Sequence, residues 1–152
     1  MSRHIGRESI ASRFEHLLKV IGSKRFLAMQ GNNNEVPFFI CDYNPAEAVE
    51  MARLQRQLVN RLDQAGVRIL EVNLYDLSID LLKARGLWER TLEIEPTVTK
   101  DELKELLQNT LDPEAHLVPE IGRRLDAADY DVLFLSGVGE VFPYIRSHNV
   151  LN

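Results

Sequence analysis

The sequence predicts an α/β fold with a Rossmann-like parallel sheet flanked by helices. Three apolar segments have the length and continuity of strands that are covered on both faces, namely residues 36–41, 67–74 and 132–135. Helical segments with capping signals separate them, and a strand–helix–strand order implies parallel strands with a right-handed crossover. The expected arrangement is P-loop-like, but it lacks the Walker motifs that bind phosphate.

Length and composition predict one domain over residues 1–152, with an N-terminal helical segment at 1–30 and the sheet and its helices at 36–152. A chain of this size can bury roughly 68–70% of its unfolded surface. No apolar run approaches the ~20 residues of a membrane helix. The single cysteine, Cys41, excludes an internal disulfide. These features predict a cytoplasmic protein with no membrane segment.

The N-terminal segment is predicted to be helical and basic. Apolar residues recur with helical spacing between Ile10 and Ile21, and Ser23 is placed to cap a short following helix. Residues 1–25 carry six basic and two acidic side chains, whereas the rest of the chain carries 12 basic and 21 acidic ones. Contact with DNA or an acidic partner and a simple solvated helix face are both open interpretations.

The first two strands are expected to be joined by one helix. Asn44 offers an N-cap, Pro45 suits the first helical position, and Glu47 stands three residues past the cap. Gly66 suits the helix C-terminus, directly before the strand at 67–74. The first strand, this helix and the second strand would form a βαβ unit.

A long helical stretch is predicted between the second and third strands. Asp76 or Ser78 is expected to cap a helix through about Leu92, with Gly86 as a break. Because residues 78–128 are long for one crossover, we expect part of them to form a small helical insertion beside the sheet.

Two further helix starts lie within that stretch. Thr99 and Glu102 form a capping box that begins a helix to about Thr110, and Asp112-Pro113 begins the next helix. The residues of this last helix expected to face inward are Leu117, Ile121, Leu125 and Ala128.

Residues 131–152 combine the third strand, a Gly-x-Gly turn and an expected helix that carries Arg146 and His148. Backbone N–H groups at a helix start favour an anion. However, Gly137-Val138-Gly139 is followed by Glu140, the third glycine of a dinucleotide motif is missing, and no lysine follows. A tight turn is therefore favoured over a phosphate loop. The residues expected to face the core are Phe142, Ile145, Val150 and Leu151.

No catalytic or metal-binding set is recognisable. The four histidines are scattered without zinc-ligand spacing, so neither a metal nor another cofactor is expected. Ser136 follows a strand as a hydrolase nucleophile would, but it lacks the Gly-x-Ser-x-Gly context. Cys41 lies in an apolar run, where a thiol is usually inert. We expect a non-enzymatic protein.

Polar residues are predicted to gather where the parallel strands end, which is the edge at which α/β folds bind ligands. The alternative is that Asn44 and Asp76 simply cap helices, which is compatible with lining a cleft. Arg146 and His148 form a second candidate, a partner surface. The predicted strand-end group comprises Asp42, Tyr43, Asn44, Asn73, Tyr75, Asp76, Ser136, Gly137 and Gly139.

Several of these motifs resemble the BrxB family of the BREX bacteriophage-exclusion system. The similar segments are Gly137-Val138-Gly139 with Phe142-Pro143 and Ile145–His148, the strand exit at 36–45, and residues 73–77. The resemblance implies a non-catalytic part of an antiviral defence complex that binds other proteins. It also implies that family members continue beyond this point, so that the chain would be an N-terminal fragment of a longer protein.

The resemblance further implies PglZ, an alkaline-phosphatase-like BREX protein, as the first partner to consider. The BREX ATPase and DNA methyltransferase are further possible partners, and self-association is another. Two alternatives stay open. The first is a nucleotide-binding or degenerate NTPase-like regulatory domain with Asp42, Asp76 and Ser136 around the ligand, and the second is an accessory subunit that contacts DNA.

Overall fold

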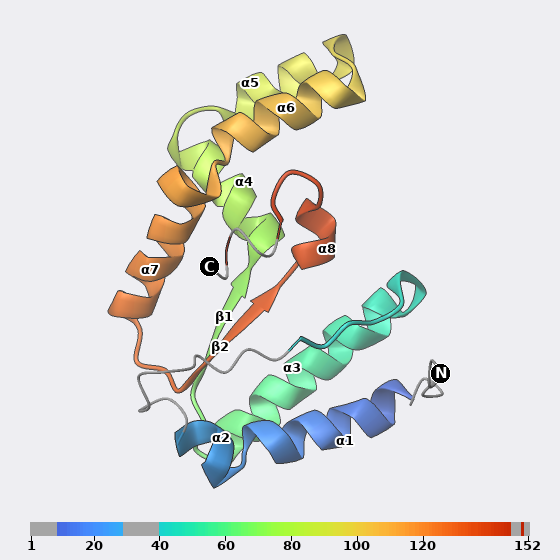
Figure 1. Ribbon diagram of the computed structural model, residues 1–152, viewed down its shortest axis with the longest axis vertical. Helices are drawn as coiled ribbons and strands as arrows, with labels where there is room; N and C mark the ends of the chain where they lie inside the picture. Colours follow the sequence, from blue (N-terminus) through green and yellow to red (C-terminus); the bar gives the residue numbers. More distant parts are fainter. Residues whose placement is uncertain (1–8, 29–39, 147–149, 151–152) are drawn as a thin grey trace, which may run out of the picture. The chain divides into compact units, whose positions relative to one another are not determined.

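The computed structural model describes residues 9–28, 40–146 and 150 (Figure 1). It divides into two compact units, Met1–Ile69 and Leu70–Asn152. The single domain expected over the whole chain stays a prediction. Within the described residues, no helix is both long and apolar enough to cross a membrane.

The first unit is built on two helices, α1 (Ile10–Ile21) and α3 (Ala48–Gln64), which pack against each other. The predicted helix over residues 10–21 is confirmed, and the Ser9 side chain caps it by accepting from the backbone N–H of Ser12. A short helix α2 (Lys24–Ala28) follows, and Ser23 caps it as expected. The buried residues of the helix pair are Ile10, Phe14, Ile21, Leu54, Leu58 and Leu62.

The predicted start of α3 is confirmed with one difference. The Asn44 Oδ1 atom accepts from the backbone N–H of Ala46 at 3.0 Å, but the first turn is the 3-10 turn η2 (Pro45–Glu47). The helix ends before Gly66, whose φ of 84° is the left-handed conformation that terminates many helices.

The described sheet has two neighbouring strands, β1 (Ile69–Asn73) and β2 (Val132–Ser136), which run parallel (Figure 1). Both correspond to predicted strands. Residues 36–39 of the expected first strand lie outside the described residues, and residues 40–41 are not in a strand. The protein is therefore a helix-rich α/β protein with a small parallel sheet, and the Rossmann-like or P-loop-like arrangement stays a prediction.

Helix α4 (Leu74–Ala84) begins directly after β1, earlier than expected. The prediction that Asp76 or Ser78 caps it was wrong. Asn73 is the N-cap, whereas the Ser78 hydroxyl is buried within the helix and donates to the Leu74 carbonyl at 2.7 Å. The expected break at Gly86 is confirmed by its φ of 69°.

The crossover from β1 to β2 contains three further helices. Helix α5 (Trp88–Ile94) leads through the 3-10 turn η3 (Glu95–Thr97) to α6 (Lys100–Thr110), whose predicted capping box between Thr99 and Glu102 is confirmed. A π-helical turn, η4 (Pro113–Leu117), then leads into α7 (Val118–Ala127).

The core of the second unit lies between the sheet, α4, η4–α7 and the segment after β2. The predictions that Leu117, Ile121 and Leu125 face inward are confirmed. Ala128 follows the last residue of α7, is half-buried and does not belong to this core. The buried residues of this core are Val72, Leu74, Leu77, Leu117, Ile121, Val141 and Ile145. The partly buried residues that pack against them are Leu70, Leu81, Leu125, Leu133, Leu135 and Val150.

The helix predicted to carry Arg146 is much shorter than expected. Helix α8 spans only Val138–Val141, and the next residues form turns that include a cis Phe142–Pro143 peptide bond. Phe142 is extended (φ −69°, ψ 135°) because a residue before proline disfavours the helical region. Its side chain is 62% exposed, so the prediction that it faces the core was wrong. Ile145 and Val150 pack in the core as predicted, and Leu151 lies outside the described residues.

Candidate functional site

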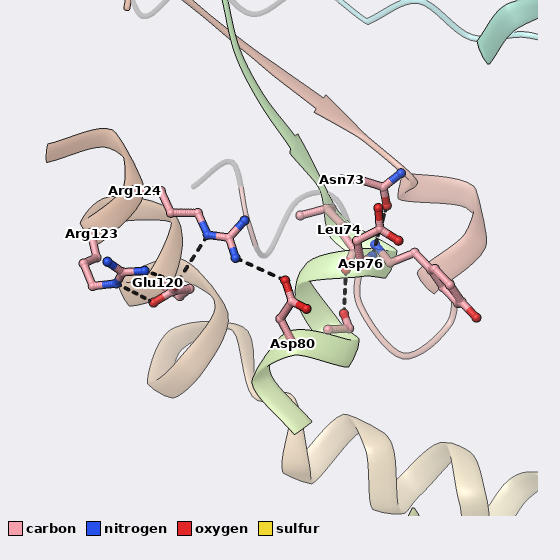
Figure 2. Close-up of polar contacts among 9 residues, drawn as sticks. Asn73, Leu74, Asp76, Asp80, Glu120, Arg123 and Arg124 are labelled. Atoms are coloured by element: carbon pink, nitrogen blue, oxygen red, sulfur yellow. Dashed lines mark hydrogen bonds and ion pairs between the residues drawn. The ribbon is translucent and has the colours of Figure 1, made fainter. Parts of the chain in front are cut away.

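The carboxyl ends of β1 and β2 meet at the start of α4, where Asn73 is the central residue. Its Oδ1 atom accepts hydrogen bonds from the backbone N–H groups of Tyr75 at 2.9 Å and Asp76 at 3.2 Å (Figure 2). A helix start has four N–H groups without intrahelical partners, and Asn73 satisfies two of them. This residue therefore connects the end of the strand to the helix without a ligand.

Gly137, which follows β2, lies against this cap. Its φ of 71° is left-handed, and a β-carbon at this position would lie 2.4 Å from Asn73 Oδ1 and 3.1 Å from the Tyr75 nitrogen. A β-carbon would therefore displace the Asn73 side chain from its capping position and press on the Tyr75 backbone. The junction favours glycine for two independent reasons, conformation and space. In contrast, a β-carbon on Gly139 would meet nothing within 4 Å. The Gly-x-Gly motif thus has one residue that the junction needs and one that it does not.

The junction is poorly suited to hold a phosphate group. Two N–H donors of α4 are already taken by Asn73, and α8 has only four residues. The exposed carboxylates of Asp76 and Glu140 add negative charge. Helix N-termini bind anions through free N–H groups, and here an amide oxygen takes the place that an anion would occupy on α4.

Three apolar side chains are exposed at this junction while their neighbours fill the core. Tyr75 is 45%, Val138 37% and Phe142 62% exposed. Their chain neighbours Leu74 and Val141 are buried. Helix α8 packs against α4, so the three exposed residues belong to adjoining segments. We call Tyr75, Asp76, Val138, Glu140 and Phe142 the strand-end surface.

The turn that carries Phe142 is held from a distant part of the chain. The Gln108 side chain, near the end of α6, donates from Nε2 to the Pro143 carbonyl at 3.0 Å. Ile145, two residues further, is 1% exposed and anchors the same turn in the core. Phe142 is therefore presented outward on a turn that is fixed on its carboxyl side.

The remaining predicted site residues are placed as follows. Asp42, Tyr43 and Asn44 belong to the first unit, where the Asp42 carboxylate pairs with Arg13 Nη2 at 3.5 Å and Asn44 caps η2. Ser136 ends β2 and is half-buried. The strand-end grouping of residues from both units stays a prediction. Arg146 is exposed, and His148 lies outside the described residues.

An ion-pair network between α4 and α7 was not foreseen from the sequence. Glu120 accepts from Arg123 at 2.7 Å and from Arg124 at 3.2 Å, and Arg124 also reaches Asp80 at 3.4 Å (Figure 2). The hydrogen bond from Arg123 is the main cause that lowers the pKa of Glu120 from 4.5 to about 2. The hydrogen bond from Arg124 and the charges of both arginines lower it further, against the opposing effect of burial. The spacing of Glu120 from Arg123 and Arg124 signals their pairing, but nothing in the sequence signals Asp80.

Within the ranges that the structure describes, no three side chains of histidine, cysteine, aspartate or glutamate are grouped so that they could hold a metal ion. The polar features of the second unit are therefore a capped helix start, an exposed aromatic surface and an interhelical ion-pair network. The first two lie together at the strand ends.

The chain is similar in sequence to BrxB proteins. A family model described as "BREX protein BrxB" matches residues 70–152, which is the extent of the second unit. A "BREX protein BrxB" from Escherichia coli O9:H4 (strain HS) is 29% identical over 140 residues, covering 92% of this chain and 69% of that protein. One from Bacillus cereus (strain H3081.97) is 29% identical over 150 residues, covering 94% and 76%. No solved structure matches.

Proposed function

The chain belongs to the BrxB family of BREX proteins, as its motifs predicted, and from this we propose that it is a non-catalytic, protein-binding component of the phage-defence system. We propose PglZ as the partner that it contacts. The contact is made through the strand-end surface of the second unit. The match of the family model to this unit supports looking there for a function common to the family.

The observation that carries the proposal is the outward presentation of Tyr75 and Phe142, which are 45% and 62% exposed. Aromatic residues supply much of the binding energy in protein interfaces, especially when a rigid support presents them. Phe142 has such a support in Ile145 and the Gln108–Pro143 hydrogen bond. Burial of the exposed parts of these aromatic side chains against a partner would stabilise the complex.

The geometry of the helix start supports protein binding over nucleotide binding. A nucleotide site at a strand end depends on free N–H groups that face the phosphates. Here Asn73 accepts from the N–H groups of Tyr75 and Asp76, and Glu140 places an exposed carboxylate on α8. An apolar contact with a protein requires none of those donors.

Co-purification with PglZ tests this function. The protein is expected to co-elute with PglZ from the same BREX system during size-exclusion chromatography. Deletion of its gene is expected to abolish phage exclusion, and complementation is expected to restore it. Failure to co-elute, together with intact phage exclusion after deletion, would contradict the proposal.

A further inference from the structure

The helical hairpin formed by α5, η3 and α6 (residues 88–110) projects from the end of α4 in the second unit (Figure 1). Neither α5 nor α6 contains a buried residue. Among the described helices of ten or more residues, α6 alone buries none. The hairpin is thus the part of this unit that the core covers least.

The apolar residues of the hairpin form an incompletely covered stripe. Leu103 and Leu107 are half-buried, whereas Leu106 is 38% exposed. Residues three or four apart share one face of a helix, so these three leucines run along one side of α6. On α5, Leu92 is 43% exposed. Two helices with apolar residues left open to solvent can accept a third helix between or along them.

The hairpin is anchored at both ends rather than by its own core. At its beginning, the ammonium of Lys83 lies 5.7 Å from the centre of the Trp88 ring. At its end, Gln108 donates to the Pro143 carbonyl and the Arg85 guanidinium donates to the Thr110 carbonyl. The capping box of Thr99 and Glu102 stabilises α6 locally. The stripe is therefore preformed.

Charge determines which kind of molecule fits this stripe. Residues 88–110 contain six acidic and three basic side chains, and all six acidic ones are exposed. Nucleic acid would be repelled. A second copy of this chain would also be disfavoured, because its acidic body carries 12 basic and 21 acidic side chains beyond residue 25. Its basic helix α1 already packs its apolar side against α3. A basic protein segment would be attracted and would bury the leucines at the same time. The exposed acidic residues are Glu89, Glu93, Glu95, Asp101, Glu102 and Glu105.

We propose that the hairpin is a second docking surface, separate from the strand-end surface, and that its occupant is a basic amphipathic helix of another BREX protein. The hairpin proposal rests on the proposed function in one respect, namely that the partner belongs to the same defence system. Leu92 and Leu106 supply the apolar contact, and the acidic side chains beside them supply the charge attraction.

The test uses the tagged full-length protein co-expressed with the complete set of BREX proteins from its own system. Recovery of each protein is compared between the wild type, a Leu92→Ser/Leu106→Ser variant and a Glu89→Lys/Glu93→Lys variant. In both hairpin variants, the recovery of the same one BREX protein is expected to fall at least ten-fold. Raising the salt concentration is expected to lower the recovery of that protein by the wild type as well. Phe142→Ser, which alters the strand-end surface, is expected to retain it.

Thermal unfolding of each variant checks that the fold is intact, which is expected because all five changed side chains are exposed. The proposal is overturned if both hairpin variants recover every BREX protein as the wild type does, or if the wild type recovers none. It is also overturned if light scattering shows an oligomer that the hairpin variants lose, because the occupant would then be a second copy. If Phe142→Ser were the only variant to lose a BREX protein, the strand-end proposal would stand and the hairpin proposal would be overturned.

Discussion

Asn73 and Gly137 approach so closely that a β-carbon on residue 137 would lie 2.4 Å from the Asn73 amide oxygen. Asn73 ends β1 and caps α4, while Gly137 follows β2 in a left-handed conformation. One short contact therefore joins two strand ends and a helix start. The strand-end surface that we assign to partner binding is built directly on this contact.

Gly137→Ala is expected to destabilise the protein strongly. The left-handed backbone costs an L-residue about 1–2 kcal/mol, and displacement of the Asn73 cap costs about 1 kcal/mol more. Urea unfolding is expected to show a loss of about 2–3 kcal/mol. Gly139→Ala is the matched control because a β-carbon there meets nothing within 4 Å, and it is expected to be neutral or stabilising. Equal effects of the two substitutions would refute the role of the close contact.

Asn73→Ala is expected to destabilise α4 by about 0.5–2 kcal/mol because two backbone N–H groups lose their acceptor. Asn73→Asp retains an acceptor oxygen of the same reach and is expected to stay close to the wild type. Both free energies come from chemical denaturation. If Asn73→Asp were as damaging as Asn73→Ala, the residue would have a role other than capping.

Local signals allowed much of the fold to be predicted. The capping box of Thr99 and Glu102 and the cap at Asn44 depend on residues close in sequence, and the apolar segments that became β1 and β2 were continuous enough to recognise. The cap at Asn73 was not predicted because the apolar Leu74 that follows it extends the expected strand by one residue. Helix α8 is shorter than predicted because Pro143 keeps Phe142 out of the helical region, whereas a proline in the first turn of a helix would have been tolerated.

Contacts between distant residues were beyond sequence reasoning. The pair of Arg124 with Asp80 joins residues 44 apart, and the Gln108–Pro143 hydrogen bond joins residues 35 apart. No periodicity marks either contact, because each depends on how α7 and α6 pack. For the same reason the sequence predicted that Phe142 faces the core, although its side chain is 62% exposed.

The Glu120 network predicts a specific dependence of stability on pH. Its pKa is lowered from 4.5 to about 2 in the folded protein, so its contribution is complete above the unfolded pKa and is lost as pH falls from 4.5 towards 2. Because Arg123 is largely exposed, solvent screening keeps this contribution small. Glu120→Gln is therefore expected to be less stable than the wild type at pH 7.

The difference between wild type and Glu120→Gln should shrink below pH 4.5 when unfolding is followed by circular dichroism. An Arg123→Gln variant and the double variant complete a mutant cycle that isolates the pair. A stability difference that stayed constant down to pH 2, or a coupling near zero, would contradict the network.

Nucleotide binding at the strand ends is expected to be absent. Because Asn73 occupies N–H donors of α4, titration with millimolar ATP or GTP and magnesium should give neither calorimetric heat nor a thermal shift. Asn73→Ala frees those donors and serves as a comparison. Saturable heat with the wild-type protein would favour the ligand-binding alternative with Asp76 and Ser136 near the nucleotide.

The central claim concerns Phe142, and its most direct test is the affinity of the full-length protein for PglZ. Phe142→Ser is expected to weaken binding at least ten-fold, which corresponds to about 1.4 kcal/mol. Val49→Ser is the matched control, because Val49 is 87% exposed and lies in the other unit. The account predicts wild-type affinity for Val49→Ser and a large loss for Phe142→Ser. Unchanged affinity of a folded Phe142→Ser variant would contradict it.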